Sequence, residues 1–296
     1  MSKSRRDILI SAISASAATV SGTLLVQRGT AQESTPQTLA QKSTNQSSMR
    51  ILLLNPNSSP DFTKIIAREA RRVASPGTEF VEVTSFFGPS YIGTRTTVAI
   101  ASHAAVDALA RTLAKDSNFD AAILTGFGAQ GVPAMREFAP FPIIGMLEAS
   151  VSAALQLGSR FSILTGGDRW VPMLEEQIYA LGLSNRVASV RAIPLTGAEI
   201  AANQDRALSM LADLSEACVR ENRAECVIFG GAAVAGLAKR IENRVSVPLI
   251  DNVAISVATA EMLARVATKP KASRSSPPAI DSVGLSDELN QLLKQP

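Results

Sequence analysis

The stretch "AAILTGFGAQGVPAMREFAPFPIIGMLEASVSAAL" (residues 121–155) decides the fold, because its pattern returns at 226–263 as "CVIFGGAAVAGLAKRIENRVSVPLIDNVAISVATAEML". In each copy an apolar run ends at glycine and a short helical segment follows. A second apolar run then begins after proline and leads into an Ala/Val-rich helix. A period near 105–110 residues is too long for a solenoid and indicates two similar halves of one architecture. The alternative is a chance likeness between alanine-rich segments.

Strand and helix patterns alternate along the whole central region. Because the apolar runs are continuous, they are typical of parallel strands buried on both faces. The predicted strands are 51–54, 79–84, 121–125, 141–145, 161–165, 187–193, 226–230 and 247–251. The helical patterns are about 61–74, 97–115, 148–157, 169–181, 203–221 and 253–267. We therefore predict an α/β fold of two pseudo-symmetric parallel-sheet halves, residues 49–146 plus 252–268 and residues 147–251.

The N-terminus has the order of an export signal. Arg5 and Arg6 precede an uncharged, Ser/Ala-rich stretch over 8–27, and small residues follow at 29–31. The paired arginines resemble the twin-arginine (Tat) signal. The alternative is a membrane anchor, but the serines and threonines and the nearby Arg28 favour the signal. We predict a Tat-type signal peptide over 1–31 and a periplasmic mature protein that is not held in the membrane.

The charge balance follows from this signal. The whole chain has a net charge of +3, and residues 1–31 hold Lys3, Arg5, Arg6 and Arg28 against Asp7 alone. The mature chain is therefore close to neutral, which excludes an electrostatically driven nucleic-acid partner. Polar residues 32–48 predict a flexible linker, and residues 269–296 a second linker followed by a short helix near 286–294. Homo-oligomerisation is left open by the sequence.

Four predicted strand ends share a signature of small or polar residues. They are "NPNSS" (55–59), "TGFG" (125–128), "TGGD" (165–168) and "GGAA" (230–233), two from each half. Ligands of parallel α/β sheets bind beyond the carboxyl ends of the strands, where glycines let backbone N–H groups approach them. We predict a cleft between the halves that binds a small carboxylate. The alternative at each loop is a tight turn and nothing more.

One loop also fits the dinucleotide fingerprint. "GFGAQG" (126–131) follows a strand, and Glu148 lies near the place of an acidic ribose ligand. However, Pro133 and Pro140 shorten the helix that follows, and the matching loop at 230–236 lacks the fingerprint. A nucleotide-dependent oxidoreductase is therefore a remote alternative, and we expect no cofactor.

In their order and spacing, the motifs resemble the hydantoin racemases of the aspartate/glutamate racemase superfamily. The resemblance rests on "ILLLNPNSS", "DAAILTGFGAQGVPAMRE", "FPIIGMLEAS", "FSILTGGDRWVPMLEE", "CVIFGGAAVAGLA" and "VPLIDNVA", and it covers about 50–267. It implies two α/β halves with the site between them and cofactor-independent racemisation at an α-carbon. It also implies that substrate contacts the residues Asn55, Asn57, Ser58, Thr125, Gly126, Phe127, Gly128, Thr165, Gly166, Gly167, Gly231, Ala232 and Ala233.

The resemblance further implies two catalytic cysteines, one per half, at positions that are Gly126 and Gly231 here. Glycine cannot transfer a proton, so the two-thiol mechanism cannot operate in this chain. Cys226 begins its strand, about 16 Å from that strand's end. We expect Cys226 and Cys218 to be buried structural thiols, with a disulfide between them as the less favoured alternative.

No other group clearly replaces the thiols. Asp168 and Asp251 are better explained as helix caps, Glu148 as a helix-start charge and His103 as a surface or structural residue. One histidine and two scattered cysteines do not form a metal site. Two functions remain open, an exported racemase-family enzyme with a different base and a binding or regulatory protein that lost catalysis.

Overall fold

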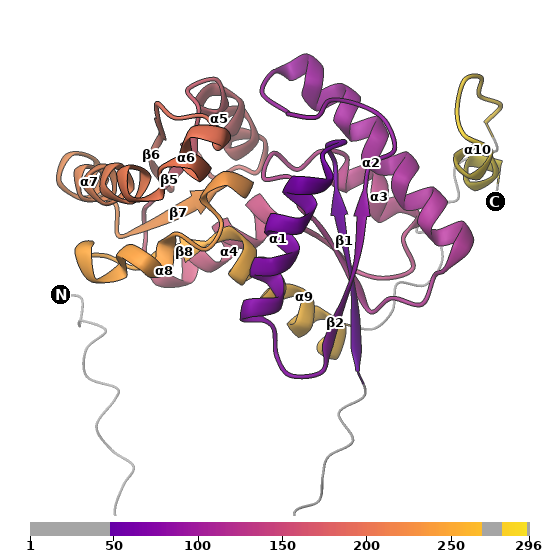
Figure 1. Ribbon diagram of the computed structural model, residues 1–296, viewed down its shortest axis with the longest axis horizontal. Helices are drawn as coiled ribbons and strands as arrows, with labels where there is room; N and C mark the ends of the chain where they lie inside the picture. Colours follow the sequence, from indigo (N-terminus) through magenta and orange to yellow (C-terminus); the bar gives the residue numbers. More distant parts are fainter. Residues whose placement is uncertain (1–47, 268–279, 295–296) are drawn as a thin grey trace, which may run out of the picture. The chain divides into compact units, whose positions relative to one another are not determined.

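The computed structural model describes residues 48–267 and 280–294, which form two four-stranded parallel sheets covered by helices (Figure 1). The predicted signal peptide, almost all of the first linker and most of the second lie outside these residues. In the first sheet the order is β2 (Thr78–Thr84), β1 (Met49–Asn55), β3 (Ala121–Leu124) and β4 (Ile143–Gly145).

The second sheet repeats this topology. Its order is β6 (Val187–Ile193), β5 (Phe161–Gly166), β7 (Cys226–Gly230) and β8 (Leu249–Asp251), with every pairing parallel. The first strand of each half is therefore central in its sheet, and the second strand lies at the edge. The predicted α/β class with two similar parallel-sheet halves is confirmed.

The predicted helices lie close to their expected ranges. The helices are α1 (Pro60–Val73), α2 (Arg95–Lys115), α3 (Val132–Phe138), α4 (Met146–Leu157), α5 (Trp170–Ala180), α6 (Gly197–Ala202), α7 (Gln204–Asn222), α8 (Ala238–Ile241), α9 (Asn252–Val266) and α10 (Asp287–Lys294). The structure thus adds the short helices α3, α6 and α8, for which no range was predicted. Short 3-10 turns cover Ala232–Val234 and Glu242–Arg244. Local chemistry sets several boundaries: Thr94 and Thr97 form a reciprocal capping box at the start of α2.

Alternate residues of β1 enter two different cores. Ile51 and Leu53 belong to a central core with Phe161 and Ile163 of β5, whereas Leu52 and Leu54 pack in a separate core with residues of α2 and α3. Both faces of the strand are thus buried. This accounts for its uninterrupted run of apolar residues.

Helices α4 and α9 join the two halves. They pack against each other, and each contacts strands of both sheets (Figure 1). At the far end of α9, the Glu261 carboxylate accepts hydrogen bonds from Ser75 N and Thr78 Oγ1 at 2.8 and 2.7 Å. Helix α9 is therefore also tied to the loop that precedes β2. Among the described helices, none is long and apolar enough to cross a membrane.

Candidate functional site

A cavity of ≈ 90 Å³ lies where the carboxyl ends of strands from both sheets meet. All four predicted loops contribute to it. Its lining consists of Pro56, Asn57, Phe62, Tyr91, Ile92, Thr125, Gly126, Phe127, Gln130, Thr165, Gly166, Trp170, Gly230, Gly231, Ala232 and Ala233. Gly126 and Gly231, one from each half, therefore face one cavity.

Backbone N–H groups from both halves are available as hydrogen-bond donors at this lining. The N–H groups of Gly126 and Phe127, and of Gly231, Ala232 and Ala233, donate to no backbone carbonyl within residues 48–267 and 280–294. Because an unpaired buried N–H costs free energy, such groups normally find a partner in a ligand or in water. The lining thus offers hydrogen-bond donors from both halves to an oxygen-rich molecule.

Aromatic rings explain two of the glycines better than tight turns do. A Cβ atom on Gly230 would lie 2.3 Å from the ring of Phe127, and one on Gly128 would lie 2.6 Å from the ring of Trp170. Phe127 comes from the first half and Trp170 from the second. Each ring therefore packs on a glycine of the other half, and the two contacts join the halves beside the cavity.

The first loop is held by its own asparagines. Asn55 Oδ1 accepts from Asn57 N at 3.1 Å, and Asn57 Oδ1 accepts from Ser59 N at 2.9 Å. Asn55 is only 1% exposed and donates to Thr63 Oγ1. These bonds form an Asx-turn, so the tight turn that was the alternative for this loop is present. Of its predicted ligand-binding residues, Asn57 reaches the cavity, while Asn55 and Ser58 do not line it.

The remaining predicted contacts divide in a similar way. Thr125, Gly126, Phe127, Thr165, Gly166, Gly231, Ala232 and Ala233 line the cavity, whereas Gly128 and Gly167 do not. Thr125 Oγ1 donates to Leu54 O at 3.3 Å, so this hydroxyl is partly engaged in the structure. Thr165 Oγ1 faces Gly231, 3.8 Å from where a Cβ atom of that residue would be.

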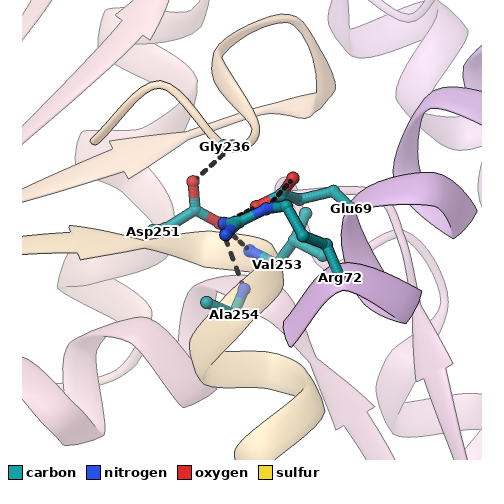
Figure 2. Close-up of polar contacts among 6 residues, drawn as sticks. All are labelled: Glu69, Arg72, Gly236, Asp251, Val253 and Ala254. Atoms are coloured by element: carbon teal, nitrogen blue, oxygen red, sulfur yellow. Dashed lines mark hydrogen bonds and ion pairs between the residues drawn. The ribbon is translucent and has the colours of Figure 1, made fainter. Parts of the chain in front are cut away.

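Asp251 anchors the loop that carries the second-half amides (Figure 2). Its carboxylate accepts from Gly236 N at 2.5 Å and, at the start of α9, from Val253 N at 3.0 Å and Ala254 N at 3.1 Å. The predicted helix cap is confirmed. Burial raises the pKa of Asp251 above its usual value, although the three N–H groups oppose this shift.

The charged groups beside Asp251 are paired with one another and do not form a second site. A larger hollow of ≈ 510 Å³ is lined by Arg72, Lys239, Glu242 and Asp251 among others. Arg72 pairs with Glu69 (Figure 2), and Lys239 pairs with Glu242. Each of these charges already has a partner, so none is directed at a ligand.

Comparison with known proteins agrees with this geometry. The Asp/Glu/Hydantoin racemase family model matches residues 51–260. The chain belongs to the Asp/Glu/Hydantoin racemase family. It is 28% identical to a hydantoin racemase of Pseudomonas sp. (strain NS671), over 75% of this chain and 88% of that one. It is 29% identical to a hydantoin racemase of Paenarthrobacter aurescens, over 73% and 91%.

Solved structures show the same relationship. The allantoin racemase of Pseudomonas fluorescens aligns with a TM-score of 0.73 and 34% identity, covering 79% of this chain and all of that one. The allantoin racemase of Klebsiella pneumoniae aligns with a TM-score of 0.74 and 27% identity, covering 82% and 99%. Unliganded arylmalonate decarboxylase, at 20% identity and a TM-score of 0.51 over 76% and 97%, shares the fold.

The two positions to which the racemase-family resemblance assigns cysteines differ in their surroundings. At Gly126, a Cβ atom would lie 2.1 Å from Gln130 Oε1 and 2.6 Å from Pro56 Cγ. At Gly231 the space is open, but the backbone has φ +115° and ψ 155°. L-residues rarely adopt that conformation. A side chain at Gly126 thus requires the Gln130 amide and the Pro56 ring to shift, and one at Gly231 is disfavoured by the backbone.

The cysteines of this racemase-family member are structural. Both are free and buried, as expected, and no disulfide joins them. Cys226 Sγ lies 3.7 Å from Ala154 O, and burial raises the pKa of its thiol to about 11. A thiol with so high a pKa carries almost no thiolate near neutral pH, and Cys226 does not line the cavity.

The other candidate bases also lie away from the cavity. The predicted cap at Asp168 is wrong: Arg169 occupies the N-cap position of α5 and Asp168 is exposed. The turn conformation of 167–170 places Asp168 too early to reach the first helical N–H groups. Glu148 is in the first turn of α4 and pairs with Arg136, and His103 is exposed on α2 against Phe87.

Sequence analysis missed several lining residues: Pro56, Phe62, Tyr91, Ile92, Gln130, Trp170 and Gly230. A signal existed for Trp170, the single tryptophan, which comes directly after the "TGGD" loop. Tyr91 and Ile92 lie in the Gly/Pro-rich loop after β2, which was not among the four strand-end loops predicted to bind. Within the described residues no group of His, Cys, Asp or Glu could hold a metal ion.

Proposed function

We propose that this racemase-family protein binds a small amino acid or related carboxylate in the cavity between the two sheets. The observation that carries the proposal is the set of unpaired N–H groups from Gly126–Phe127 and Gly231–Ala233. Carboxylate and carbonyl oxygens are the natural partners for such donors, and a dry site strengthens their attraction. Allantoin and hydantoin, named with the relatives, carry carbonyl oxygens that the same donors fit.

The second part of the proposal is that paired thiols play no role. No lining residue carries a carboxylate, a thiol, an imidazole or an amine. Positioned acid–base groups contribute about 10²–10⁴-fold to proton abstraction. The Tyr91 phenol is the one titratable side chain of this lining among the described residues, so the cavity favours binding over racemisation. Family membership supports a second candidate, isomerisation at an α-carbon with a base other than cysteine.

One experiment separates the two candidates. The mature chain is incubated in deuterated water with amino acids, hydantoin, allantoin and maleate, while NMR follows α-proton exchange and a thermal scan follows unfolding. We expect at least one compound to raise Tm and none to exchange. Ligand at 100 times its Kd stabilises by about 2.7 kcal/mol. Exchange would establish the second candidate, and the absence of any stabilisation would refute binding.

A matched pair of variants assigns any binding to this cavity. Ala232→Leu adds three carbon atoms to a lining residue, and Ala180→Leu makes the same change at the exposed end of α5. We expect the first variant to lose the ligand-induced rise in Tm and the second to keep it. If both variants lose the ligand-induced rise in Tm equally, or if both keep it, the ligand binds elsewhere.

Export to the periplasm is proposed on the sequence alone. Arg5 and Arg6 before the apolar stretch and the small residues at 29–31 support it. Cell fractionation of the full chain and of a variant with Arg5→Lys and Arg6→Lys tests it. We expect the natural chain in the periplasm, beginning near Gln32 by mass spectrometry, and the variant to remain as uncleaved precursor. A natural chain that keeps residues 1–31 would contradict export.

A further inference from the structure

Gln130 places an unpartnered polar side chain in the wall of the cavity. It lies in the turn after β3, it is only 2% exposed, and it lines the cavity. Its Oε1 atom is buried and accepts no hydrogen bond from any described residue. Buried acceptors without a donor are rare in folded proteins, and each one calls for an explanation.

Two glycines make room for this side chain. A Cβ atom on Gly126 would lie 2.1 Å from Gln130 Oε1, and a Cβ atom on Gly128 would lie 2.6 Å from Gln130 Nε2. The carboxamide thus lies across the backbone of 126–128, in space that larger residues at either position would fill. Glycine at 126 is explained by this close approach, and the polar group at this wall of the cavity is an amide.

The amide complements the other polar groups of the cavity. The backbone N–H groups of Gly126 and of Gly231 donate, whereas an amide oxygen accepts. A ligand that carries an oxygen acceptor beside an N–H donor could satisfy both kinds of group together. A ligand with the oxygen alone would leave Gln130 Oε1 without a donor.

We propose that Gln130 is a specificity-determining residue that accepts a hydrogen bond from an N–H group of the ligand. The ligand class is a small molecule in which an amine, amide or ureide N–H lies next to a carboxylate or carbonyl. This inference rests on the proposed function, since it concerns the ligand of the same cavity. It assigns the discrimination to a side chain four residues beyond Gly126 and not to the backbone donors.

The test compares matched ligands and matched variants. The ligand pairs are aspartate with succinate, and hydantoin with 1,3-dimethylhydantoin, which differ in their N–H groups. The variants are Gln130→Met and the control Gln177→Met. Gln177 also has a buried Oε1 without a partner, but it lies on α5 and does not line the cavity. Affinities are measured by calorimetry, and Tm is measured without ligand.

We expect the natural protein to prefer the N–H member of at least one pair by about tenfold. Gln130→Met should bring that ratio close to one, and Gln177→Met should leave it unchanged. Without ligand, Gln130→Met should raise Tm by about 2–4 °C, because methionine fills the space without a buried acceptor.

The possible failures are distinguishable. Binding without N–H preference, or a preference that survives in Gln130→Met, overturns this inference and leaves the proposed function standing. A fall in Tm of ligand-free Gln130→Met also overturns it, since the amide would then stabilise the fold by itself. If no probe binds the natural protein, the proposed function and this inference fail together.

Discussion

Replacing Gly231 tests the claim that the backbone itself excludes a side chain at this wall of the cavity. The residue has φ +115° and ψ 155°, a combination that is essentially restricted to glycine. A Cβ atom there would have Thr165 Oγ1 as its nearest neighbour at 3.8 Å, which is ordinary contact. The destabilisation of Gly231→Ala therefore comes from backbone strain, with no contribution from crowding.

The expected loss is about 1–3 kcal/mol in the free energy of unfolding. Urea titration followed by circular dichroism measures it, and a lower midpoint with an unchanged m-value identifies a change in stability. Gly231→Cys should lose at least as much, because cysteine faces the same backbone strain. We also expect both variants to weaken ligand binding, since relaxing the strain turns the N–H groups of 231–233 away from the cavity.

Gly182→Ala is the control for this experiment. Gly182 has φ +71° in open space, but it lies after α5 and does not line the cavity. It should lose stability and keep its ligand. If Gly231→Ala unfolds within about 0.5 kcal/mol of the natural protein, the strain assigned to this residue is wrong.

Further consequences follow from the same contacts. Gly230→Ala should destabilise by about 1–3 kcal/mol in urea titration, because the Phe127 ring must move. Burial alone would raise the pKa of Glu261, but its hydrogen bonds and a nearby arginine outweigh burial and lower it. The stability that the ionised Glu261 contributes should therefore be lost as the pH falls below 4.5, the usual pKa of glutamate. Glu261→Gln should make the free energy of unfolding less dependent on pH in this range. Burial raises the pKa of Asp251, so its pH dependence has the opposite sign. Its contribution to the free energy of unfolding should be present below pH 3.8, the usual pKa of aspartate, and lost as the pH rises through the folded-state pKa. A comparison of unfolding with Asp251→Asn across this pH range measures it. Cys226, with a pKa of about 11, should resist iodoacetamide at pH 8 until the protein unfolds.

Each of these results has a clear opposite. Unchanged stability of Gly230→Ala would mean that the ring has room to move. Parallel pH slopes of the Glu261 and Asp251 variants would contradict the opposite signs of their shifts. Rapid alkylation of Cys226 in the folded state, observed by mass spectrometry, would mean that the thiol reaches solvent.

The fold was predictable because the signal for each strand is local. Runs such as Ile51–Leu54 and Val227–Phe229 are buried on both faces, and the turns between elements carry glycine and proline. The internal repeat then fixed the number of halves. The observed strand ends differ from the predicted ones by one or two residues. Hydrogen bonding with neighbouring strands, and not the length of the apolar run, determines where a strand ends.

The cavity was predictable only as far as the backbone is concerned. Strand ends in parallel sheets converge by topology, so the glycine loops were found. The direction in which a side chain points after a turn cannot be predicted from the spacing of residues in the sequence. Gln130 and Trp170 enter the site because Gly126 and Gly128 leave room for them, and such reciprocal packing needs coordinates. The prediction that Asp168 caps α5 was wrong for a related reason. The helix begins at Trp170, so Arg169 and not Asp168 occupies the N-cap position.

The two glycines to which the family resemblance assigns cysteines are therefore not equivalent positions. At Gly126 the space of a side chain is taken by the Gln130 amide, whereas at Gly231 the space is free and the backbone conformation excludes one. Cysteines placed at both positions would have to displace a buried amide in one half and rebuild a loop held by Asp251 in the other. Gly126→Cys combined with Gln130→Ala should fold better than Gly126→Cys alone, and no change at position 130 should rescue Gly231→Cys. The distinction is tested by the urea midpoints of Gly126→Cys and Gly231→Cys, each measured alone and combined with Gln130→Ala. Equal rescue by Gln130→Ala at both positions would refute it.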